Sequence, residues 1–178
     1  KTLVYLIGTG PGAPGLLTTR GQRCLDVADV VIYDRSVHPR VLDLAPARAE
    51  RIDVGRPARE ATDQDAISFL LAEKAREGKV VARLKQGDPF VFDRGGEEAL
   101  FLHEQGIPFE VVPGVPVVLG VAAYAGIPLT YPGGGDTLTI VRGHEAGNGE
   151  RTRINWALLA KLEGTLVCFG GRDELAEG

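Results

Sequence analysis

The sequence alternates short apolar, β-branched runs with segments of helical periodicity, and this alternation constrains the fold more than any other feature. Five such runs lie before residue 113, at residues 3–7, 29–33, 51–54, 80–84 and 109–112. Helical patterns separate them, at residues 18–28, 38–44, 62–78 and 97–105. Strands that alternate with helices usually form one parallel sheet with helices packed on it. The sequence therefore predicts an α/β fold with a mostly parallel sheet.

The regular alternation of strand and helix patterns ends at Pro113-Gly114. Beyond this point come an apolar helix of small residues, a glycine-rich loop, a strand, a helix and a last strand, expected at 115–125, 128–136, 137–141, 153–162 and 165–169. We therefore predict an N-terminal α/β domain at residues 1–113 and a second, incomplete α/β domain at residues 114–178. A cleft between two domains is a common place for a ligand, and we expect the site there.

Composition narrows the class of protein. The 178 residues are 44% hydrophobic and 25% charged, which is typical of a soluble globular chain. No long apolar run and no signal-peptide pattern is present, so we expect a cytoplasmic protein and no membrane partner. A net charge of -4 disfavours nonspecific nucleic-acid binding. Cys24 and Cys168 have no partners at metal-ligand spacing, which predicts free thiols and no metal site.

The segment 83–98 concentrates the polar chemistry of the chain, between a predicted strand and a predicted helix. Gly87 permits a turn or a close backbone approach, and Asp88 stands rigidly before Pro89 at the carboxyl end of the strand. Ligands of open α/β sheets bind at this edge. Asp93 can cap the following helix, and Arg94 places a fixed cation beside the same edge.

Two further loops reach the same edge of the predicted sheet. The loop Gly8-Thr9-Gly10-Pro11-Gly12 follows the first strand, but Pro11 and the missing Gly-Lys-Ser/Thr disfavour a phosphate cradle. Asp34 ends the second strand. It is either a capping or turn aspartate for the next helix or an acid-base residue, and the sequence leaves both open.

Four motifs together resemble the tetrapyrrole methylase family. They are YLIGTGPGAPGLLT at 5–18, ADVVIYD at 28–34, GDPFVF at 87–92 with RGGEE at 94–98, and AYAGIPLT at 123–130. The resemblance covers the whole chain in order. The Arg-Gly-Gly-Glu-Glu ending at 94–98 is most similar to the branch of the family that methylates uroporphyrinogen III.

The resemblance implies a two-domain α/β enzyme, usually a homodimer, that binds S-adenosylmethionine between its domains. It would methylate two pyrrole carbons of the tetrapyrrole substrate uroporphyrinogen III, giving precorrin-2 for siroheme and cobalamin. Asp34 matches a proton acceptor, Arg56 the position of a lysine proposed as proton donor, and Arg94 and Glu97 residues beside the substrate. The implied cofactor contacts are Pro11, Gln86, Gly87, Asp88, Val91, Pro116, Val117 and Gly170.

Several positions differ from the family pattern. Gln86 replaces a glycine of the cofactor loop, Pro116-Val117 replace a threonine and a small residue, and Tyr131-Pro132 replace a histidine-arginine pair. Arg56 does not readily release a proton, so it suits an anchor better than an acid. Two alternatives therefore stay open: a relative that binds the cofactor or a tetrapyrrole without turnover, and a methyltransferase of the same family with another substrate, such as another corrinoid precursor.

Overall fold

The computed structural model describes residues 4–55, 64–142 and 154–169. The chain divides into two compact units, Lys1–Val117 and Val118–Gly178, which are described separately. The predicted domain boundary after Pro113 stays a prediction.

The first unit is built on a five-stranded sheet in the order β3-β2-β4-β1-β5. Every strand pairing in this sheet is parallel, which confirms the predicted α/β fold and the mostly parallel sheet. The strands are β1 (Val4–Gly8), β2 (Val30–Tyr33), β3 (Glu50–Asp53), β4 (Val81–Lys85) and β5 (Phe109–Val112).

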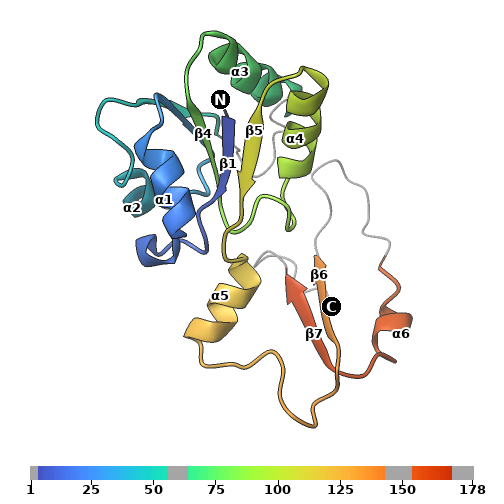
Figure 1. Ribbon diagram of the computed structural model, residues 1–178. Coiled ribbons are helices and arrows are strands. Elements are labelled where there is room, and N and C mark those ends of the chain that lie inside the picture. The colour runs from blue at the N-terminus through green and yellow to red at the C-terminus, as the bar shows by residue number, and fades with distance from the viewer. Residues whose placement is uncertain (1–3, 56–63, 143–153, 170–178) are drawn as a thin grey trace. The chain divides into compact units, whose positions relative to one another are not determined.

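Helices cover both faces of this sheet, as Figure 1 shows. One face carries α1 (Thr19–Asp26) and α2 (Pro39–Leu42), and the other carries α3 (Gln64–Arg76) and α4 (Gly95–Glu104). Successive strand residues point to opposite faces, so Leu6 packs in the α3 and α4 core while Ile7 packs in the α1 and α2 core. Parallel strands buried on both faces need the near-continuous apolar runs that the sequence shows.

The helix ends follow local capping chemistry. The Thr18 side chain accepts a hydrogen bond from the Gly21 N–H and caps α1, close to the predicted start. The helix α2 is shorter than the predicted segment 38–44; His38 caps it, with Nδ1 accepting from the Arg40 N–H at 3.2 Å. A 3-10 turn at Pro14–Leu16 separates the first loop from α1.

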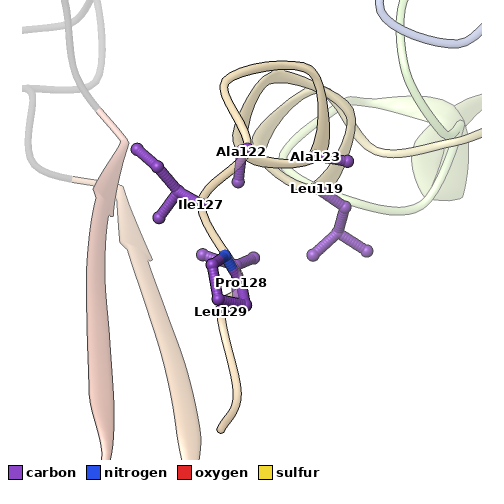
Figure 2. Close-up of a pocket in the computed structure, with 7 residues that line it drawn as sticks. Leu119, Ala122, Ala123, Ile127, Pro128 and Leu129 are labelled. Carbon is purple, nitrogen blue, oxygen red and sulfur yellow. The ribbon is translucent and has the colours of Figure 1, made fainter.

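The second unit holds a parallel pair of strands, β6 (Leu138–Arg142) and β7 (Thr165–Phe169). The helix α5 (Val117–Tyr124) begins at the boundary of the two units, and α6 (Trp156–Leu159) is a single short turn of the longer predicted helix. A pocket of about 430 Å³ lies between α5 and the segment that follows it, lined by Leu119, Ala122, Ala123, Gly126, Ile127, Pro128 and Leu129 (Figure 2). Among the described residues, no helix combines the length and apolar character that crossing a membrane requires.

Candidate active site

Three loops meet backbone to backbone at the carboxyl edge of the first sheet. The N–H of Gly10 donates to the Gly87 carbonyl at 3.1 Å, and the N–H of Gly87 donates to the Gly10 carbonyl at 2.8 Å. A Cβ on Gly8 would lie 2.6 Å from both the Gly114 nitrogen and the Gly87 oxygen, which is closer than real Cβ contacts come. Glycine is therefore required at this junction, because any side chain would separate the loops.

The junction gathers three of the predicted cofactor segments of the first unit. Pro11 follows Gly10 in the first loop, and Gly87 lies in the loop after β4 with a φ of +68°. A Cβ on Gly87 would lie 3.3 Å from Val117 Cγ2 and 3.7 Å from Pro116 Cα, which brings the segment after β5 to the same place. Their roles in cofactor binding stay predictions.

Asp88 holds the loop after β4 in shape. Its Oδ1 accepts from the Phe90 N–H at 2.9 Å, and its Oδ2 accepts from the Gly114 N–H at 3.0 Å. Both carboxylate oxygens therefore bind backbone of the protein itself. Asp88 therefore joins two loops of the junction, and its contact with a cofactor stays a prediction.

The surface beside this junction is partly apolar. Val91 is 39% exposed and its neighbours Phe90 and Phe92 are 56% and 40% exposed. The side chains of Pro11 and Gln86 are half-buried. The capped start of α1 lies beyond the 3-10 turn, so the first loop does not lead directly into a helix N-terminus as a phosphate site would. The apolar surface of a nucleoside fits these exposed side chains better than a pyrophosphate does.

Asp34 is almost fully buried after β2, at 5% exposure. The suggestion that it caps the next helix is wrong, because His38 is the cap; the Asp34 carbonyl instead accepts from the Val37 N–H in a turn. Its carboxylate Oδ1 accepts from Arg83 Nη2 at 2.9 Å. Within the described residues, Oδ2 makes no hydrogen bond. An acid-base role for Asp34 stays a prediction.

Asp34 contacts a buried cluster of charged side chains through Arg83. Arg83 and Lys85 are on β4 and Glu98 is on α4, and all three side chains are 0% exposed. Glu98 Oε1 lies 3.1 Å from Arg83 Nη2 and 3.2 Å from Lys85 Nζ, and it also accepts from Gln64 Nε2 at 3.2 Å. Burial alone raises the pKa of the Glu98 carboxyl, but Arg83 and Lys85 outweigh burial and hold that pKa below its ordinary value.

Asp93 belongs to the edge of this cluster and does not cap α4 as predicted. The N-cap of α4 is Arg94, without a side-chain hydrogen bond. Asp93 Oδ1 lies 2.9 Å from Lys85 Nζ and accepts from the Arg94 N–H at 2.6 Å. The buried ammonium explains the difference, since it attracts the carboxylate inward and away from the first turn of the helix.

Arg94 and Glu97 form a partly exposed pair at the start of α4. Arg94 Nε and Nη2 donate to the two carboxylate oxygens of Glu97 at 2.9 and 2.6 Å. These hydrogen bonds raise the pKa of Arg94 above its ordinary range, so the guanidinium stays charged at any physiological pH. Glu97 thus aligns the planar guanidinium of Arg94, a group whose geometry matches carboxylates, and the roles of both residues stay predictions.

Four positions that the sequence analysis singled out are not found at the carboxyl edge of the first sheet. Arg56 and Gly170 lie outside the described residues. Tyr131 and Pro132, which stand in place of a histidine-arginine pair, are exposed in the second unit. Sequence reasoning missed the buried charges of Arg83 and Lys85. The available signal was two cations two residues apart on one face of an apolar strand, which cannot be buried without carboxylate partners.

An open parallel sheet with its loops joined at the carboxyl edge defines an α/β ligand-binding protein of the kind in which substrates bind beyond the strand ends. The chain belongs to the Tetrapyrrole (Corrin/Porphyrin) Methylases, whose family profile matches residues 3–177.

Individual relatives agree with this membership. The chain is 47% identical over 169 residues to an S-adenosyl-L-methionine-dependent uroporphyrinogen III methyltransferase of Methanosarcina barkeri, covering 94% of this chain and 66% of the relative. It is 48% identical over 175 residues to a siroheme synthase of Chromobacterium violaceum, covering 98% of this chain and 37% of the relative. The chain therefore spans less than two thirds of the length of these relatives.

A solved structure shares the fold at a similar level of identity. The uroporphyrin-III C-methyltransferase of Thermus thermophilus, complexed with S-adenyl homocysteine, is 47% identical and superposes with a TM-score of 0.67. The match covers 81% of this chain and 57% of that one.

Proposed function

We propose that the protein is an S-adenosylmethionine-dependent methyltransferase that converts uroporphyrinogen III to precorrin-2. The observation that carries the proposal is the glycine junction, which joins the loops of Pro11, Gly87 and Val117 at one edge of the sheet. Asp34 follows β2 at the same edge. The similarity to the Methanosarcina barkeri methyltransferase supports the choice of cofactor and substrate.

The chain's own residues would bind and orient the two reactants. Pro11, Gln86 to Asp88, Val91, Pro116 and Val117 would hold S-adenosylmethionine, which supplies an electrophilic methyl group on a positive sulfur. A pyrrole carbon is electron-rich and needs little activation, so the main contribution of the protein is alignment of this carbon with the methyl group.

Three further groups complete the proposed site. After methyl transfer, Asp34 Oδ2 would accept the proton that the ring loses, because Oδ1 is already held by Arg83. Arg94 would bind a side-chain carboxylate of the tetrapyrrole through its planar fork, with Glu97 holding the guanidinium in place until substrate arrives. Arg56, with its permanent charge, would act as a second anchor.

The direct test is incubation of the purified full-length protein with uroporphyrinogen III and S-adenosylmethionine, followed by absorbance of the precorrin-2 chromophore. Binding of S-adenosylhomocysteine is measured separately by calorimetry. Chromophore formation together with binding is the expected result. Binding without the chromophore would favour a relative without turnover, or a branch that methylates another corrinoid precursor.

A variant tests the role of Asp34 within this reaction. Asp34→Asn should lower turnover at least about tenfold, the lower part of the range for one acid-base group, with S-adenosylhomocysteine affinity nearly unchanged. Parallel losses of turnover and cofactor affinity would make Asp34 a structural residue instead.

The proposal includes a homodimer that acts in the cytoplasm without a nucleic-acid partner. The net charge of -4 supports the last point, because phosphate backbones need a basic surface. Light scattering during size-exclusion chromatography tests the dimer, and a mass of one chain at micromolar concentration would contradict it.

A further inference from the structure

The carboxyl end of β4 buries two cations on an otherwise apolar face of the sheet. Arg83 and Lys85 follow Val81 on the sheet face that α3 and α4 cover, where the neighbouring strand residues are apolar. Arg83 is level with Leu6 of β1 and Ile32 of β2. An apolar side chain would fill such a place at least as stably as an ion pair does, because burying charge has a large desolvation cost. The charge of Arg83 therefore calls for a functional explanation.

Arg83 binds both Glu98 of α4 and Asp34 at the end of β2. Its Nε and Nη2 both lie 3.1 Å from Glu98 Oε1, while Nη2 also lies 2.9 Å from Asp34 Oδ1. Glu98 in turn is held by Lys85 and Gln64. The guanidinium is thus fixed by Glu98 on one side and fixes the Asp34 carboxylate on the other.

We propose that Arg83 is the positioning residue for Asp34, and that Glu98 holds Arg83 in place for this purpose. The inference rests on the proposed function, in which Asp34 accepts a proton. A carboxylate bound at Oδ1 has lost most of its rotational freedom, so Oδ2 keeps one direction toward the ring proton. A guanidinium suits this position because it stays protonated and cannot exchange protons with the base that it orients.

The first test separates positioning from binding. In Arg83→Lys and Arg83→Gln, kcat for precorrin-2 formation should fall about 10- to 100-fold, the loss typical of a displaced reacting group. The KM for the tetrapyrrole and the affinity for S-adenosylhomocysteine should stay within about threefold. Lysine keeps the charge but not the fork, so Arg83→Lys should retain more activity than Arg83→Gln. Unchanged kcat in both variants would overturn the proposal.

The second test asks whether Arg83 acts through Asp34. Combined with Asp34→Asn, Arg83→Lys should lower the residual kcat by less than about threefold, because the group that it positions is already inactive. If the two losses multiply, Arg83 acts independently of Asp34 and the proposal is wrong. Arg20→Gln is the matched control: it removes an arginine with two hydrogen bonds to Glu110 on the surface of the same unit, and kcat should not change.

A third variant keeps the proposal testable if Arg83 variants do not fold. Glu98→Gln leaves the contact between Arg83 and Asp34 but weakens the support behind it, so kcat should fall with KM unchanged. A folded Glu98→Gln protein with wild-type kcat would count against the positioning role.

Failure of the proposed function can be distinguished from failure of the positioning role. If the proposed function is wrong, the wild-type protein makes no precorrin-2, or Asp34→Asn keeps full turnover. Either result removes the role assigned to Arg83 as well.

Discussion

The substitution Glu98→Gln measures how much of the stability of the first unit depends on the buried charge cluster. It keeps the volume of the side chain and an oxygen that can accept hydrogen bonds, but it removes the negative charge between Arg83 and Lys85. The new amide nitrogen would take the place of Oε2, which has no hydrogen-bond partner in the described part of the chain. Its N–H groups would then be buried without an acceptor. Both changes destabilise the folded state.

The expected magnitude follows from what each cation retains. Removing one partner of a buried ion pair typically costs about 3–5 kcal/mol, because an uncompensated charge is left behind. Here Arg83 keeps Asp34 at 2.9 Å and Lys85 keeps Asp93 at 2.9 Å. The loss should therefore lie at the low end, at about 3 kcal/mol in the free energy of unfolding near neutral pH.

The pKa shift of Glu98 determines how the stability difference should change with pH. Burial raises the pKa of Glu98, but Arg83 and Lys85 more than offset burial, so the folded-state pKa is below the ordinary value of 4.5. A lowered pKa stabilises the fold above that ordinary value, and the contribution is lost as the pH falls through the folded-state pKa. The difference between wild type and Glu98→Gln should thus be largest near neutral pH and shrink in acid.

Urea unfolding followed by circular dichroism, repeated from about pH 7 down to about pH 3, measures this difference. The matched control is Glu97→Gln, the next residue of α4, whose carboxylate is exposed and paired with Arg94 on the surface. That change should cost less than about 1 kcal/mol. If Glu98→Gln is as stable as wild type at neutral pH, or if the difference is the same at every pH, the electrostatic reasoning is refuted.

Three other changes test the site. Gly8→Ala should lower the free energy of unfolding by about 2 kcal/mol or more and abolish S-adenosylhomocysteine binding, since the new methyl group overlaps Gly114. The control Gly15→Ala has open space around it, so thermal unfolding should show a change in stability of less than about 0.5 kcal/mol. Asp88→Asn should cost about 1–3 kcal/mol and weaken cofactor binding by calorimetry, because one of the two backbone N–H groups loses its acceptor. Arg94→Lys should keep part of the turnover and mainly raise the KM for the tetrapyrrole; lost turnover with unchanged substrate affinity would return Arg94 to the acid-base candidates.

Local sequence determined the elements of the first unit and their order. Buried parallel strands need apolar, β-branched runs, and the Thr18 cap acts within a few residues of itself. For that reason the strands β1 to β5, their parallel class and the edge at which Gly87 lies could all be predicted. The motifs that resemble the tetrapyrrole methylases were also contiguous, so family membership was visible before the fold was.

Only the tertiary structure decided which charges meet. Arg83, Glu98 and Asp34 come from β4, α4 and the end of β2, and their distances depend on the strand order and on how α4 packs. The same holds for Asp88, whose second acceptor contact is to Gly114, and for Asp93, which the buried Lys85 draws away from the helix cap. Sequence patterns describe neighbours along the chain, whereas a buried charge is stabilised by partners that folding alone brings within hydrogen-bond distance.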